Sequence, residues 1–183
     1  MAPSGGYVVG RQELVEKAGF RLAAPGIRAA AGLGSTKALA QGLFMAPSTV
    51  GEALKGGLLV AETMAYLGYD TIPPCGERGY VRAVRLGCEH KVRSFCEAVQ
   101  QAGPVGAFVR ATMGESDGYA DRVLFAQSTF VDGCTAELSA DAPAREPWAV
   151  FAQGGLCWQH WALALARIVS GVGWASDSHL SAD

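Results

Sequence analysis

The feature that most constrains the fold is a helical repeat of apolar residues between positions 49 and 67. The apolar face of this repeat comprises Val50, Leu54, Leu58, Ala61 and Ala65. Thr49 and Glu52 have the spacing of a capping box, which marks a helix start, and Gly68 is a stop signal. The sequence therefore predicts one long helix over residues 49–67.

Shorter elements are predicted on either side of this helix. Before it, residues 7–10 favour a strand and residues 11–22 favour a helix. After it, a short strand or an extended connector is predicted just before Pro73. Strands are predicted at 80–86, 107–111, 122–130, 135–140 and 148–153, and helices at 89–102 and 158–169. This order predicts an α/β fold with a strand–helix start, a long bridging helix and a compact α+β unit.

Composition and charge exclude several classes of protein. Of the 183 residues, 50% are hydrophobic, and the formal net charge of −2 comes with no long basic run. A nucleic-acid partner is not expected, because phosphate binding needs clustered lysine and arginine. Gln159, His160 and Arg167 interrupt the longest apolar stretch, which therefore indicates a buried helix and no membrane span. With no signal-type N-terminus, the sequence predicts a soluble, cytoplasmic protein.

The five cysteines do not predict a metal site. None belongs to a Cys-x-x-Cys pair, and the spacing is irregular. Cys157 with His160, and Cys88 with His90, are two-ligand fragments, whereas a zinc site needs about four organised ligands. We expect reduced thiols and no bound metal, and we give a redox or metal-binding function a low rank.

Arg145 is the strongest candidate for ligand binding that the residues themselves offer. It lies in a loop between Pro143 and Pro147, where the backbone is stiff. A guanidinium group there could clamp a carboxylate through two parallel hydrogen bonds. The alternative is an exposed structural ion pair with Glu146, and the spacing alone leaves both interpretations open.

Several runs of residues, in one order along the chain, resemble a known family. Glu-Leu-Ser-Ala-Asp-Ala-Pro at 137–143 and Arg-Glu-Pro at 145–147 are two of them. The others lie at 4–11, 24–27, 40–47 with 50–56, 128–131 and 153–156 followed by His160. Together they cover residues 3–168 and resemble the methionine gamma-lyase-like, or aluminium-resistance, family of enzymes that use pyridoxal 5′-phosphate (PLP).

The resemblance implies the C-terminal portion of a fold-type I PLP-dependent transferase fold. Residues 1–48 would be a remnant of the large PLP-binding domain, and residues 49–67 would be its linking helix. Residues 68–172 would form the small C-terminal α+β domain, followed by a flexible tail at 173–183.

The function implied by the resemblance is that of a PLP-dependent carbon–sulfur lyase of the methionine gamma-lyase or cystathionine beta-lyase type. Such an enzyme acts on a sulfur amino acid and is expected to be a homo-oligomer. The resemblance places Gly5, Gly6 and Tyr7 near the cofactor and makes Arg145 the ligand of the substrate carboxylate.

The resemblance also leaves this chain without a catalytic residue. The family's cofactor lysine falls just before the segment that resembles residues 4–7, and none of Lys17, Lys37, Lys55 and Lys91 matches its position. We therefore expect the chain alone to have no lyase activity. The alternative is a non-catalytic interaction module that associates with full-length homologous subunits.

Overall fold

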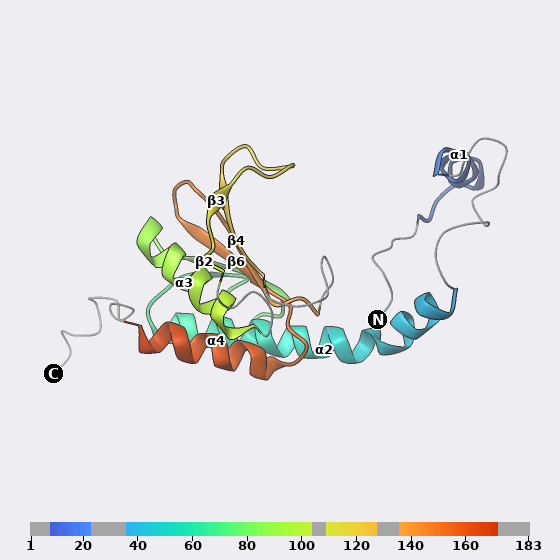
Figure 1. Ribbon diagram of the computed structural model, residues 1–183. Coiled ribbons are helices and arrows are strands. Elements are labelled where there is room, and N and C mark those ends of the chain that lie inside the picture. Colours follow the sequence, from blue (N-terminus) through green and yellow to red (C-terminus); the bar gives the residue numbers. More distant parts are fainter. Residues whose placement is uncertain (1–7, 23–35, 104–108, 128–135, 172–183) are drawn as a thin grey trace. The chain divides into compact units, whose positions relative to one another are not determined.

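The computed structural model describes residues 8–22, 36–103, 109–127 and 136–171 (Figure 1). The chain divides into two compact units, residues 1–47 and 48–183. The first unit contains helix α1 (Gln12–Leu22), which confirms the helix predicted at 11–22. The strand predicted at 7–10 is wrong for residues 8–10, which are exposed and pair with no described strand; Tyr7 lies outside the described residues.

Helix α2 (Thr36–Tyr66) begins well before the predicted start at Thr49. Pro47 lies inside this helix, and the boundary between the two units falls directly after it. The prediction was wrong because Pro47 and the Thr49–Glu52 spacing imitate a helix start, while the preceding Ala- and Leu-rich residues have helix propensity of their own.

The C-terminal end of α2 is where the sequence predicted it. Gly68 adopts a φ of 84°, in the left-handed region that favours glycine. Its N–H donates to the carbonyl of Ala65 over 2.9 Å, and the N–H of Tyr69 donates to the carbonyl of Met64 over 2.9 Å. These two bonds form a Schellman motif, which ends the helix.

The second unit holds a six-stranded sheet in the order β1-β2-β6-β5-β4-β3, in which every neighbouring pair is antiparallel. Its strands are β1 (Thr71–Ile72), β2 (Val81–Arg85), β3 (Met113–Gly114), β4 (Val123–Gln127), β5 (Ser139–Pro143) and β6 (Ala149–Gln153). Of the two alternatives for the segment before Pro73, the structure has the short strand, β1. The strands predicted at 80–86, 122–130 and 148–153 are confirmed where the structure describes them.

Two strand predictions needed correction. Of the strand predicted at 107–111, residues 107 and 108 lie outside the described residues, and residues 109–111 are not in a strand. The short strand β3 lies further on, at Met113–Gly114. The strand predicted at 135–140 is instead β5, Ser139–Pro143, so the strand begins and ends later in the chain than expected. Buried Glu137 and Leu138 lie just outside β5, and Leu138 extends the apolar signal of the strand itself.

Helices α3 (Glu89–Ala102) and α4 (Trp158–Ser170) confirm the two helices predicted after the long one. α3 lies across the sheet and α4 runs beside α2 (Figure 1). The core fills the space between these helices and one face of the sheet. Its buried side chains include Val60, Met64, Val84, Val92, Phe95, Val99, Leu124, Ala140, Val150, Trp161 and Ile168.

Arg82 on β2 ties α2 to the connection between β1 and β2. The residue is fully buried, and its guanidinium group donates to backbone carbonyls. Its partners are Gly57 (3.0 Å), Pro73 (2.5 Å), Pro74 (3.2 Å) and Glu77. The buried cation thus has several acceptors, and the buried carbonyl of Gly57 has a donor.

Glycines set the close approach of α2 to its neighbours. A Cβ atom at Gly57 would overlap the carbonyl oxygen of Gly79, and one at Gly56 would lie 2.5 Å from Cδ1 of Trp161. The indole N–H of Trp161 donates to the carbonyl of Gly154 over 2.9 Å. Only glycine at 56 and 57 therefore permits this packing.

Within the described ranges, no helix is both long enough and apolar enough to cross a membrane.

Candidate functional site

Arg145 lies in the tight connection between β5 and β6. The N–H of Arg145 donates to the carbonyl of Pro143 over 2.9 Å, and the N–H of Trp148 donates to the carbonyl of Arg145 over 2.8 Å. The Glu146–Pro147 peptide bond is cis, and Trp148 has a φ of 53°. This turn holds the backbone of Arg145 while its side chain is 66% exposed and can meet a ligand.

The exposed ion pair considered for Arg145 exists, but its partner is not Glu146. Nε of Arg145 lies 3.4 Å from Oδ2 of Asp121 in the loop between β3 and β4. The Glu146 carboxylate instead accepts a hydrogen bond from Nε1 of Trp148 over 2.7 Å. Asp121 engages one edge of the guanidinium group, which leaves the terminal nitrogens as donors for a second carboxylate.

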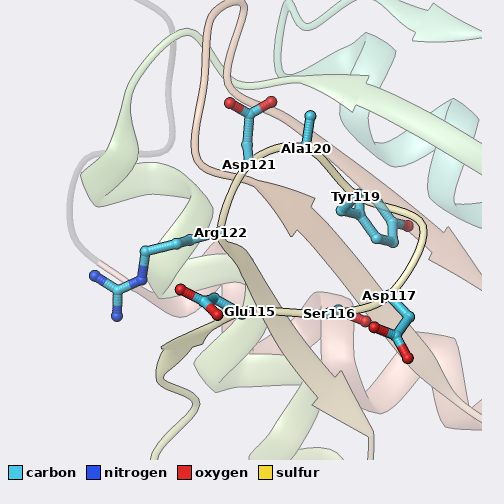
Figure 2. Close-up of a pocket in the computed structure, with 7 residues that line it drawn as sticks. All are labelled: Glu115, Ser116, Asp117, Tyr119, Ala120, Asp121 and Arg122. Carbon is cyan, nitrogen blue, oxygen red and sulfur yellow. The ribbon is translucent and has the colours of Figure 1, made fainter.

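The same β3–β4 loop encloses a surface pocket of about 580 Å³, shown in Figure 2. Nη2 of Arg122, one of the residues that line this pocket, donates to the carbonyl of Met113 over 2.6 Å. The pocket is lined by Glu115, Ser116, Asp117, Tyr119, Ala120, Asp121 and Arg122. Three carboxylates against one guanidinium group make this pocket unsuitable for the phosphate of PLP, because like charges repel at close range.

Tyr119 connects this loop to the face of the sheet that lies opposite the core. Its ring meets the ring of Phe125 on β4 edge-on, with centroids 6.2 Å apart and planes at 85°. Asp141 on β5 pairs with Phe125. Burial, and then the charge of Glu137, raise the pKa of the Asp141 carboxyl to about 6. Burial, and then Asp141, raise the pKa of Tyr119.

The surroundings of Lys17, Lys55 and Lys91 do not resemble those of a cofactor nucleophile. Lys17 pairs with Glu13 over 2.6 Å and Lys55 pairs with Glu52 over 2.5 Å, and both amines are well exposed. Nζ of Lys91 lies 5.0 Å from the centroid of the Tyr69 ring. A lysine that forms a covalent bond to a carbonyl is usually activated in a desolvated pocket, and the exposed, ion-paired amines of Lys17 and Lys55 have no such surroundings.

The predicted cofactor-proximal residues Gly5, Gly6 and Tyr7 lie outside the described residues. In the part of the chain that is described, no group of three His, Cys, Asp or Glu side chains could hold a metal ion. Asp121 and Asp141 were not assigned a role from the sequence. No sequence pattern around Asp121 indicates a functional role. Asp141 becomes a candidate only when the strand pairing is known, because the pairing places it between Phe125 and Phe151.

Comparison with known proteins places the chain in a family. The sequence pattern of the family described as methionine gamma-lyase matches residues 1–173. An uncharacterised protein encoded in the glnA 5′ region of Lactobacillus delbrueckii subsp. bulgaricus is 36% identical over 93% of this chain and 57% of its own length. The uncharacterised protein YnbB of Bacillus subtilis is 36% identical over 87% of this chain and 39% of its own length.

Solved structures agree with this result. A candidate cystathionine beta-lyase involved in aluminium resistance from Clostridium acetobutylicum is 38% identical and superposes with a TM-score of 0.76, over 87% of this chain and 38% of that one. A carbon–sulfur lyase involved in aluminium resistance from Clostridium novyi is 33% identical, with a TM-score of 0.75 and the same coverage of both chains, 87% and 38%. This chain thus spans well under two thirds of the length of these relatives, and it belongs to the methionine gamma-lyase family.

Proposed function

We propose that the chain is the C-terminal portion of a fold-type I, PLP-dependent carbon–sulfur lyase that acts on sulfur amino acids. The observation that carries this proposal is the superposition, at 33% identity and a TM-score of 0.75, on a carbon–sulfur lyase over 87% of the chain. Under this proposal, residues 1–48 belong to the large domain, residues 49–67 to the linking helix and residues 68–172 to the small domain, with the tail at 173–183. The intact enzyme is proposed to be a cytoplasmic homo-oligomer.

Arg145 is proposed to hold the carboxylate of the substrate. Its stiff turn fixes the start of the side chain, and Asp121 restrains the guanidinium group from one edge at 3.4 Å. A restrained guanidinium group loses less conformational entropy when it binds a planar carboxylate than a free one does. In this role Asp121 is a positioning residue, because it acts on the ligand only through Arg145.

PLP is proposed as the cofactor of the intact enzyme, where it supplies the electron sink for loss of the α-proton and of the sulfur group. The described residues do not fit a PLP site on their own: the pocket beside Asp121 is acidic, Lys17 and Lys55 pair with carboxylates, and Lys91 lies over an aromatic ring. No described residue is therefore assigned to the cofactor, and Gly5, Gly6 and Tyr7 remain the proposed cofactor-proximal residues.

The carboxylate site can be tested on the chain as it is. We would titrate isotopically labelled protein with methionine and with methionine amide, which lacks the carboxylate, and follow backbone amide shifts by NMR. Methionine is expected to shift the amides near Arg145, and Arg145→Met is expected to abolish these shifts. Equal shifts with methionine amide would refute the assignment of Arg145.

The expected lack of activity is tested separately. Purified chain with added PLP is predicted to release no 2-oxo acid from methionine or cystathionine. Borohydride reduction followed by peptide mapping is predicted to label no single lysine. Specific labelling of Lys17, Lys37, Lys55 or Lys91 together with turnover would contradict this prediction.

A second candidate function is a non-catalytic module that associates with full-length homologous subunits. The observation in its favour is the exposure of large apolar side chains on α2: Leu43 is 78% exposed and Phe44 is 83% exposed. Adjacent exposed apolar side chains of this size favour association. Light scattering after size exclusion, with and without a full-length homologue, tests this function. A monomer in both samples would exclude it, whereas loss of a mixed species in the Leu43→Glu variant would support it.

A further inference from the structure

Three side chains form a row on the face of the sheet that lies opposite the core. Asp141 on β5 pairs directly with Phe125 on β4 and with Phe151 on β6. Directly paired residues point to the same face of a sheet, with Cβ atoms about 4.5–5.5 Å apart. The carboxylate of Asp141 therefore stands between two aromatic side chains, in the middle of three adjacent strands.

This row is open on one side and closed by an aromatic ring on the other. Phe151 is 36% exposed, so a small solute can reach it. The ring of Tyr119, which is 41% exposed, packs edge-on against Phe125. The next residues along β5, Ala140 and Ala142, are fully buried in the core, which confirms that Asp141 points to the other face.

Asp141 has no counter-ion among the residues that the structure describes. Arg145, four residues further on, pairs with Asp121, and Arg122 donates to the carbonyl of Met113. Burial and the charge of Glu137 both work against the ionised form of Asp141. A partly buried carboxylate without a cation is costly, and a bound cation would remove most of that cost.

We propose that Asp141, Phe125 and Phe151 form a binding site for a primary ammonium group carried on a short aliphatic chain. The carboxylate neutralises the charge, while the aromatic rings attract the cation within about 6 Å of their centroids and cover its methylene groups. A metal ion does not fit, because the site offers one carboxylate and two rings that have no ligand atoms. The ammonium group can belong to a free amine or to a lysine side chain of a partner protein.

Butylammonium is the probe of the chemistry, and 1-butanol is its neutral counterpart. Amide shifts would be followed by NMR on the full chain at pH 8. Butylammonium is expected to bind saturably, with the largest shifts on β4, β5 and β6, and 1-butanol is expected to bind at least tenfold more weakly. A third titration, with the capped tripeptide Gly-Lys-Gly, separates the sources: tighter binding of the tripeptide than of butylammonium assigns the site to a partner's lysine, and weaker binding assigns it to a free amine.

Variants connect the binding to the named residues. Asp141→Asn keeps the shape and removes the charge, and is expected to weaken butylammonium binding at least tenfold. Phe151→Leu keeps an apolar side chain and is expected to weaken binding about threefold, because one aromatic face is lost. Asp70→Asn, which removes an 82% exposed carboxylate elsewhere, should change nothing.

The proposal is overturned if 1-butanol binds as well as butylammonium, if Asp141→Asn binds with unchanged affinity, or if no saturable binding occurs. Thermal melts of each variant would show that it is folded. This experiment does not measure lyase activity. If butylammonium does not bind, the proposed carbon–sulfur lyase function is not contradicted, and if the enzyme is inactive, the proposed ammonium site is not contradicted.

Discussion

Oε2 of Glu52 on α2 lies 3.1 Å from the backbone nitrogen of Trp158, the first residue of α4. A side chain of one helix thus caps the N-terminus of another, 106 residues later in the chain. Cys157, the N-cap residue of α4, makes no such bond with its own side chain. The carboxylate therefore supplies both an acceptor for a free N–H and a negative charge at the positive end of the helix dipole.

We predict that Glu52→Ala lowers the urea midpoint of unfolding and that Glu52→Gln lowers it less, because the amide oxygen can still accept the bond. Lys55, through its side-chain hydrogen bond, and then the Trp158 N–H lower the pKa of Glu52 below its ordinary value of 4.5. Since the folded value is the lower one, this stabilisation is present above pH 4.5 and is lost as the pH falls through the folded value. Lys55→Met removes the ion pair but keeps the cap, so a loss equal to that of Glu52→Ala would contradict this account.

The sequence predicted α3 and α4 well because each has an amphipathic repeat with a clear end. In α3 the apolar residues at helical spacing, Val92, Phe95, Cys96 and Val99, are all fully buried. The start of α2 was predicted wrongly, because local signals at Pro47 imitate a helix start although the residues before it have helix propensity of their own.

The candidate site was less predictable than the fold, because it depends on strand register. Arg145 could be found from its stiff, proline-flanked loop. Its partner Asp121 lies in another connection and becomes its neighbour only through the pairing of β4 with β5. The row around Asp141 likewise requires the registers of two strand pairs, which a single sequence does not contain.

Gly57→Ala is predicted to destabilise the fold by about 1–3 kcal/mol, because the new methyl group would overlap the carbonyl oxygen of Gly79 and the backbone would have to move. Gly51, in the same helix, has nothing within 4 Å of the place that a Cβ atom would take, so Gly51→Ala is the matched control. That control is expected to stabilise the protein by about 0.5–1 kcal/mol. Urea unfolding of both variants tests the pair, and equal effects would show that the contact with Gly79 does not limit the packing.

Arg82→Met is predicted to destabilise the protein by about 3 kcal/mol, because it removes several hydrogen bonds from a charged donor and leaves the buried carbonyl of Gly57 unpaired. Arg85, on the same strand, is 51% exposed and lies 4.0 Å from Asp70. Arg85→Met should therefore cost no more than about 0.5 kcal/mol. Comparable losses in the two variants, measured by chemical unfolding, would exclude the buried hydrogen bonds of Arg82 as the cause.

Asp141→Asn is predicted to raise stability at pH 8 by about 1 kcal/mol, a value discounted for the partial exposure of the carboxyl group. The folded pKa of about 6 exceeds the ordinary value of 3.8, so the protonated form favours folding. In the unmodified protein this favourable contribution is fully present below pH 3.8 and is lost as the pH rises through about 6. The gain from Asn should shrink as the pH falls, and a gain independent of pH would show that desolvation of the charge is not its cause.

The hydrogen bonds from Arg82 to four backbone carbonyls determine how the connection between β1 and β2 can open locally. Gly57 belongs to a helix, whereas Pro73, Pro74 and Glu77 belong to the connection between two strands, and one guanidinium group holds them all. The connection cannot lift away from the helix one bond at a time, because each step would leave a buried cation short of acceptors. The connection is therefore expected to open in one step, at a rate set by withdrawal of that one side chain.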